Sequence, residues 1–61
     1  MTFESFQGKD VKVVYEDGTK IKTARGVLKL LNNDFVEISG ELGTMIIREN
    51  NIVKMGLNYK R

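Results

Sequence analysis

One segment, DVKVVYEDGTKIKTARGVLKLL (residues 10–31), contains an alternating run, a turn signal and a second, longer run of extended character. In the first run Val11, Val13 and Tyr15 fall on one side of the chain, with the period of two that marks a half-buried strand. The pair Asp17-Gly18 follows at once, and glycine supplies the positive φ that a tight hairpin turn needs. We therefore predict an antiparallel hairpin. Its two strands are Asp10–Glu16 and Thr19–Leu31.

The second of these strands is unusually long and has Gly26 in its middle. Strands are usually about five or six residues long. A glycine inside a strand indicates a bend or bulge, as where one strand serves both sides of a barrel. We therefore expect a sharp bend at Gly26.

Three short apolar runs follow, and turn-forming residues separate them. The turns are Asn32-Asn33-Asp34, Gly40-Glu41-Leu42-Gly43 and Glu49-Asn50-Asn51, and the strands are Phe35–Ser39, Thr44–Arg48 and Ile52–Met55, the last extending as far as Tyr59. Short strands with a turn about every ten residues predict an all-β fold. The long, kinked second strand favours a strongly bent, closed five-stranded barrel over an open sheet.

The first residues predict one turn of helix. Phe3 and Phe6 are spaced by three, and Thr2 stands where a capping hydroxyl belongs. A turn this short does not persist alone, so both phenylalanines are expected to pack over one end of the barrel. No linker, repeat or proline divides the chain, and residues 1–61 are expected to form one domain.

Composition narrows the chemistry. The 61 residues include no cysteine and no histidine, so the common metal clusters and nucleophile–base pairs cannot be assembled. The acidic pair Asp34 and Glu37 lies at a turn, where carboxylates commonly face water, and the Gly40 to Gly43 turn lacks the lysine of a nucleotide-binding loop. We predict no enzymatic activity, no metal, no cofactor and no small-molecule substrate. A core this small favours oligomerisation as a source of stability.

Charge and hydropathy indicate the environment of the protein. Met1–Gln7 has neither the basic nor the apolar region of a secretory signal, and no apolar run approaches the roughly 18 to 20 residues of a membrane span. We expect a soluble, cytoplasmic protein without membrane contact. The formal charge of +2 is mild for a polyanion-binding protein. Two basic groups form either a phosphate-facing patch or a solvated strand face: Lys20, Lys22 and Arg25, and Lys54, Lys60 and Arg61.

Two segments resemble the motifs of a known family. GVLKLLNNDFVEI (residues 26–38) resembles the first Sm motif, in which a glycine-centred strand runs through an acidic turn into the next strand. IRENNIV (residues 47–53) is similar to the second Sm motif, a corner with arginine, glycine and asparagine. With Gly8-Lys9 and Asp17-Gly18 the pattern covers nearly the whole chain in order, and on this ground the chain resembles the Sm-like and Hfq-like family. The resemblance implies an SH3-like barrel and a ring in which the fourth strand of one subunit pairs with the fifth of the next.

The resemblance also implies residues for binding single-stranded RNA. Phe35 stands where the family stacks a base, and Arg48 and Asn50 match the corner arginine and asparagine. Glu37 replaces the asparagine of the first motif, and Glu49 replaces the glycine of the second. A carboxylate only accepts hydrogen bonds and repels phosphate, so both changes weaken the usual uridine pocket. The alternative is that Phe35 is a barrel-rim aromatic and that Arg48 pairs with Glu37 or Glu49.

Consecutive apolar residues in the last two strands favour assembly. A barrel interior takes only one face of a strand, and the remainder with its open edge is an aggregation hazard unless a neighbour pairs with it. The predicted interface residues are Met45, Ile47, Ile52 and Val53. A monomer in which the helix or tail covers them is the alternative. We therefore predict a non-enzymatic RNA-binding homo-oligomeric ring, with a protein-interaction or structural oligomerisation barrel lacking a base pocket as the alternative.

Overall fold

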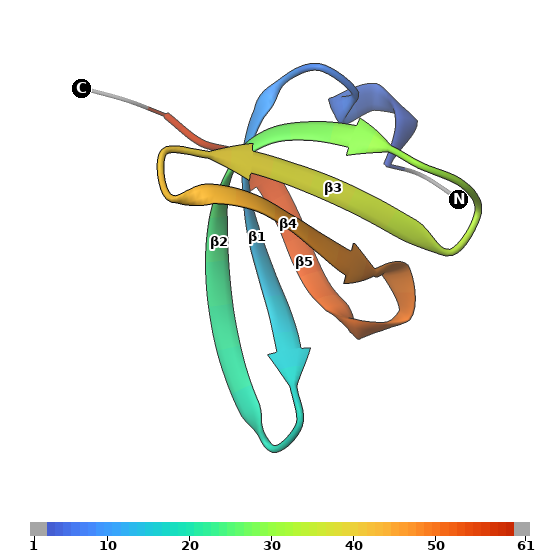
Figure 1. The fold of residues 1–61 in the computed structure, drawn as a ribbon, viewed down its shortest axis with the longest axis vertical. Coiled ribbons are helices and arrows are strands. Elements are labelled where there is room, and N and C mark those ends of the chain that lie inside the picture. The colour runs from blue at the N-terminus through green and yellow to red at the C-terminus, as the bar shows by residue number, and fades with distance from the viewer. Residues whose placement is uncertain (1–2, 60–61) are drawn as a thin grey trace.

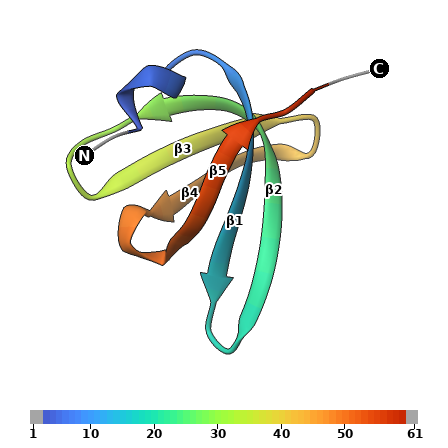
Figure 2. The same ribbon diagram turned by 180° about the vertical axis from the view of Figure 1, so that it is seen from behind.

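The computed structural model describes residues 3–59 and has five antiparallel strands with two short 3-10 turns (Figures 1 and 2). The strands are β1 (Asp10–Asp17), β2 (Lys20–Leu30), β3 (Phe35–Gly40), β4 (Gly43–Arg48) and β5 (Ile52–Leu57); the turns are η1 (Glu4–Phe6) and η2 (Glu49–Asn51). The predicted all-β class, the five strands and the short N-terminal helical turn are confirmed. Within the described residues, no helix is long and apolar enough to cross a membrane.

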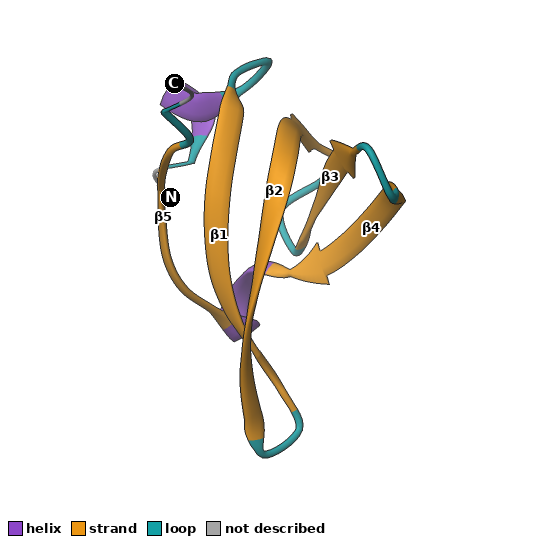
Figure 3. Cartoon of the chain, turned by 90° about the vertical axis from the view of Figure 1, so that its left-hand side faces the viewer, coloured by secondary structure: helices purple, strands orange, loops and turns teal. Residues whose placement is uncertain are grey.

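The strands form one sheet in the order β4-β3-β2-β1-β5, which Figure 3 shows from the side. β2 pairs with β1 from Lys20 to Val27, and its last part, from Val27 to Leu30, pairs with β3. The strands β4 and β5 therefore lie at the two ends of the sheet, and no ladder joins them within the described residues. The prediction of a strongly bent, closed barrel is wrong for this chain: the sheet is open, because each end strand pairs on one side only.

The N-terminal segment lies along the second half of β2, beyond the end of β1. The amide of Gly8 donates to the Leu28 carbonyl at 2.8 Å, and the amide of Leu28 donates to the Lys9 carbonyl at 3.0 Å. Phe3 and Phe6 of the first turn pack against the core, as predicted, although no side chain caps η1. The predicted capping residue, Thr2, lies outside the described residues.

The core lies on one face of the sheet, here called the inner face, where alternate side chains of four strands meet. Its six buried residues are Val11, Val13, Leu28, Val36, Ile38 and Ile47, none more than 4% exposed. The alternation in the sequence therefore assigned β1 and β3 to the correct faces, since Val36 and Ile38 point inward together. Seven further apolar residues pack around this cluster: Phe3, Phe6, Tyr15, Ala24, Leu30, Ile52 and Met55.

Two glycines allow β2 and β3 to cross closely where β2 passes from one partner to the other. A Cβ on Gly26 would lie 2.6 Å from the carbonyl carbon of Ser39 and 2.9 Å from the amide nitrogen of Gly40. A Cβ on Gly40 would lie 2.5 Å from the carbonyl oxygen of Arg25. Both obstacles are backbone and cannot move aside. Gly26, where the sequence predicts a sharp bend, is therefore a position that a side chain would crowd, and the crowding comes from this close approach of β2 and β3 and not from barrel closure.

Candidate functional site

The candidate site is on the outer face of β2, β3 and β4, opposite the core. Because Val36 and Ile47 point inward as partners, their neighbours Phe35 and Arg48 point outward and face each other across β3 and β4. The next outward position of β3 is Glu37, whose register partners are Lys29 on β2 and Ile46 on β4. This outer row therefore places an aromatic ring, a guanidinium, a carboxylate and an ammonium on three adjacent strands.

Arg48 lies over the ring of Phe35. Its Cζ atom is 5.7 Å from the ring centroid, at the outer limit of about 6 Å for a cation–π contact. Arg48 is exposed and Phe35 is half-buried. Within residues 3–59 no ion pair joins Arg48 to Glu37 or Glu49, so the alternative in which a carboxylate neutralises the arginine is not what the structure has. The guanidinium keeps its hydrogen-bond donors available to a ligand.

The two corners beside Phe35 and Arg48 are tied together. The amide of Glu49 donates to the carbonyl of Asp34 at 2.8 Å, which joins the β2–β3 turn to the start of η2. The side-chain oxygen of Asn32 accepts from the amides of Asp34 and Phe35 at 2.7 and 3.1 Å. An asparagine that bonds backbone amides two and three residues ahead holds a turn in one shape. The backbone at Phe35 is therefore held by hydrogen bonds that involve both corners.

Glu37 is half-buried and has one weak hydrogen bond. The Ser39 hydroxyl donates to its Oε2 atom at 3.4 Å, and Ser39 and Thr44 lie 3.4 Å apart through their hydroxyls. Lys29 was not among the residues predicted from the sequence. Lys29 is identified as the neighbour of Glu37 only once the register of β2 and β3 is known.

Asn50 is less closely placed. It is exposed in η2, two residues beyond Arg48, and within the described residues no hydrogen bond joins it to Phe35 or Glu37. The structure therefore brings Phe35, Glu37 and Arg48 onto one face and leaves Asn50 at its margin.

The four predicted interface residues occupy different environments. Met45 and Val53 are exposed, by 41% and 54%, whereas Ile52 is half-buried against the core and Ile47 is 4% exposed within it. The β1–β5 register shifts after Val14, so that Val53 has no residue facing it. Two exposed edge residues were not predicted: Ile46 on β4, 59% exposed, and Leu57 on β5, 40% exposed.

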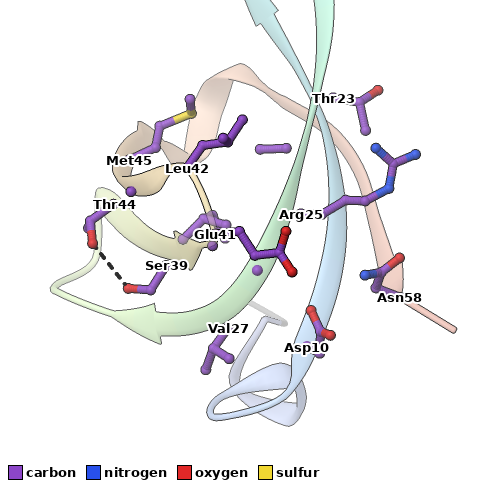
Figure 4. Close-up of a pocket in the computed structure, with 15 residues that line it drawn as sticks. Asp10, Thr23, Arg25, Val27, Ser39, Glu41, Leu42, Thr44, Met45 and Asn58 are labelled. Carbon is purple, nitrogen blue, oxygen red and sulfur yellow. Dashed lines mark hydrogen bonds between the residues drawn. The ribbon is translucent and has the colours of Figure 1, made fainter. Parts of the chain in front are cut away.

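A groove with a volume of about 750 Å³ lies at the other end of β3. Figure 4 shows Leu42 and Met45 on one side of it and Arg25 and Asn58 on the other. None of the four predicted RNA-binding residues lines this groove. A smaller hollow of about 390 Å³ lies beside the tied corners, and its lining includes Phe3, Leu31 and Glu49.

The one resolved pKa shift among the described residues lies outside the candidate site. Lys22 Nζ is 2.7 Å from Asp17 Oδ2 in the β1–β2 hairpin. The hydrogen bond to Asp17 and the charge of that carboxylate raise the pKa of Lys22 above its ordinary value of 10.5.

Comparison of the chain with protein-family models, curated proteins and solved structures finds no significant match.

Proposed function

We propose that this protein is a non-enzymatic, Sm-like RNA-binding module that assembles into a homo-oligomeric ring and engages single-stranded RNA at Phe35 and Arg48. The observation that carries the proposal is the pair itself: an arginine that pairs with no carboxylate of residues 3–59 lies over an aromatic ring, on a face that backbone hydrogen bonds hold in place. Single-stranded RNA is recognised by bases stacked on aromatic rings or guanidinium planes.

Stacking and charge have different roles at this pair. Base stacking on an aromatic side chain contributes about 1 to 3 kcal/mol and tolerates any base. The guanidinium matches phosphate oxygens with two parallel hydrogen bonds. A nucleotide stacked at Phe35 therefore brings its phosphate within reach of Arg48, and of Lys29 on the neighbouring strand.

The sheet edges support the assembly part of the proposal. The inner face continues onto both end strands through Met45 on β4 and Leu57 on β5, which are 41% and 40% exposed. Open strand edges are templates for pairing with another chain. If β4 of one subunit pairs with β5 of the next, both edges are satisfied and both side chains are covered. Such head-to-tail contacts close into a ring when the rotation permits.

The alternative is an oligomerisation or protein-interaction domain without a base site. It is favoured by Ile46 and Val53, which are 59% and 54% exposed at the two edges and belong to no core. Glu37 and Glu49, beside the proposed site, also repel phosphate. In this alternative the edges bind protein and the outer face binds nothing.

Titration of fluorescent single-stranded RNA octamers of mixed sequence, at about 50 and 200 mM salt, tests the proposal. We expect binding that weakens with salt, because phosphate contacts release counterions. Phe35→Ala and Arg48→Ala should each weaken binding about tenfold. Arg25→Ala is the matched control, since it removes a positive charge in the distant groove. Equal binding by Phe35→Ala and wild type, or no binding by wild type at low salt, contradicts the proposed RNA site.

Sedimentation tests the assembly. Wild type should sediment above the monomer mass of 7.0 kDa, and Met45→Lys should shift it toward the monomer by placing a charge in the paired edge. Ile21→Lys is the matched control, because Ile21 is 60% exposed in the hairpin away from both edges. Wild type that sediments as a monomer across micromolar concentrations contradicts the ring.

A further inference from the structure

Glu37 and Phe35 share the outer face of β3 and are separated by one inward residue, Val36. Alternate residues of a strand are about 6.6 Å apart, which is close to the width of a nucleobase. A base stacked on the Phe35 ring with its edge along β3 therefore presents that edge to Glu37. No Lys or Arg nitrogen in residues 3–59 lies within 4.0 Å of the Glu37 carboxylate, although Lys29 is its register partner.

A carboxylate reads bases differently from an amide, because both of its oxygens accept and neither donates. Guanine offers two adjacent donors on its Watson–Crick edge, N1–H and the N2 amino group. Adenine and cytosine each offer one exocyclic amino group. Uracil offers N3–H between two carbonyl oxygens, which a carboxylate repels. Of the four bases, guanine alone satisfies both carboxylate oxygens.

We infer that Glu37 makes the outer face of β3 a guanine-selecting site, in which the base stacks on Phe35 and its N1–H and N2 amino group donate to the two Glu37 oxygens. This inference rests on the proposed function and adds which base the proposed RNA site prefers. The 3.4 Å hydrogen bond from Ser39 is weak and engages only one of the two carboxylate oxygens. Guanine therefore has only this weak bond to displace when it binds. Lys29, the register partner of Glu37, and Arg48, the register partner of Phe35, carry positive charges that offset the repulsion between the carboxylate and the RNA backbone.

The inference is tested with labelled uridine heptamers that carry one guanosine, adenosine, cytidine or inosine at the centre, titrated into wild type. The heptamer with guanosine should bind about tenfold more tightly than all-uridine, as expected for a two-bond base contact. Inosine lacks the N2 amino group and should lose about half of that gain on a logarithmic scale.

Glu37→Gln is the decisive variant, because an amide has one acceptor where guanine needs two. It should abolish the preference for guanosine and make inosine and guanosine equal. Glu49→Gln is the matched control: it removes the same charge at the neighbouring corner and should keep the preference. A guanosine preference that survives Glu37→Gln overturns the inference.

The outcomes separate this inference from the proposed function. Binding that depends on Phe35 and Arg48 but ranks the four bases equally overturns guanine selection and leaves the RNA site standing. Absence of binding to every heptamer at low salt overturns both.

Discussion

The inner and outer faces of the sheet differ in what holds their residues in place. On the inner face six side chains from four strands are at most 4% exposed, and two backbones cross at Gly26 and Gly40 with no room for a Cβ. On the outer face three of those strands carry Lys29, Glu37 and Arg48: Arg48 Cζ lies 5.7 Å from the centroid of the Phe35 ring, and the side chain of Glu37 accepts one hydrogen bond of 3.4 Å. Strand alternation therefore places the buried core on one face of the sheet and leaves these polar side chains of the other face open to solvent.

Neighbours on β4 give the sharpest test of this separation. Ile47 is 4% exposed on the inner face, and Ile46 is 59% exposed on the outer face. Ile47→Lys should lower the free energy of unfolding by about 4 kcal/mol, because it buries an unpaired charge and removes core packing. A chain of this length is stable by roughly 3 to 9 kcal/mol. Circular dichroism during urea unfolding should therefore show the unfolding midpoint of Ile47→Lys at a much lower urea concentration than that of wild type.

Ile46→Lys is the control for this prediction. A substitution at an exposed position changes the free energy of unfolding by about 0.5 kcal/mol or less. Equal losses in the two variants would mean that β4 does not have the register found here, and the distinction between the faces would fail for this strand.

The glycine crossing gives the next largest effect. Gly26→Val should destabilise by about 3 kcal/mol, because its Cβ would overlap the backbone of Ser39 and Gly40. Gly56→Ala is the matched control, since nothing lies within 4 Å of a Cβ at that position. Thermal melts should show a large drop for the first variant and little change for the second. A melting curve of Gly26→Val that matches wild type would remove the close crossing.

The faces of β1 and β3 were predictable from the sequence because their apolar residues alternate. β4 was not, since Met45, Ile46 and Ile47 are consecutive and a run of three apolar residues does not reveal which one points inward. Ile47, one of the predicted interface residues, is 4% exposed within the core of the subunit. The register settles this: pairing Gly40 with Gly43 across the turn places Val36 opposite Ile47.

The same register places Phe35 opposite Arg48, so this part of the candidate site could be predicted once the turn was fixed. Lys29 could not be found in this way, because its pairing with Glu37 depends on the shape of the turn over residues 31–34, which the side chain of Asn32 holds. Whether the sheet closes into a barrel could not be predicted either. Closure depends on the summed twist of all five strands, whereas Gly26 indicates only one place where two strands come close together.

The smallest expected effect on stability is at the β1–β2 hairpin. There the inner-face positions beyond the core carry charged side chains in place of apolar ones. Lys22 faces Tyr15 in the β1–β2 register and pairs with Asp17. The pKa of Lys22 is raised by the hydrogen bond and charge of Asp17, so Asp17→Asn should return it toward 10.5. The raised pKa means that this pair's stabilisation is fully present below about pH 10.5 and is lost as pH rises through the folded-state value. The pair is exposed, so the effect on melting should be small.

Titration of the Lys22 side chain by NMR measures the shift directly, with Glu16→Gln, a carboxylate change on the opposite face of β1, as the control. An identical Lys22 titration in Asp17→Asn and wild type would mean that the ion pair does not form in solution. Lys22 and Asp17 would then each be solvated separately at the end of the hairpin.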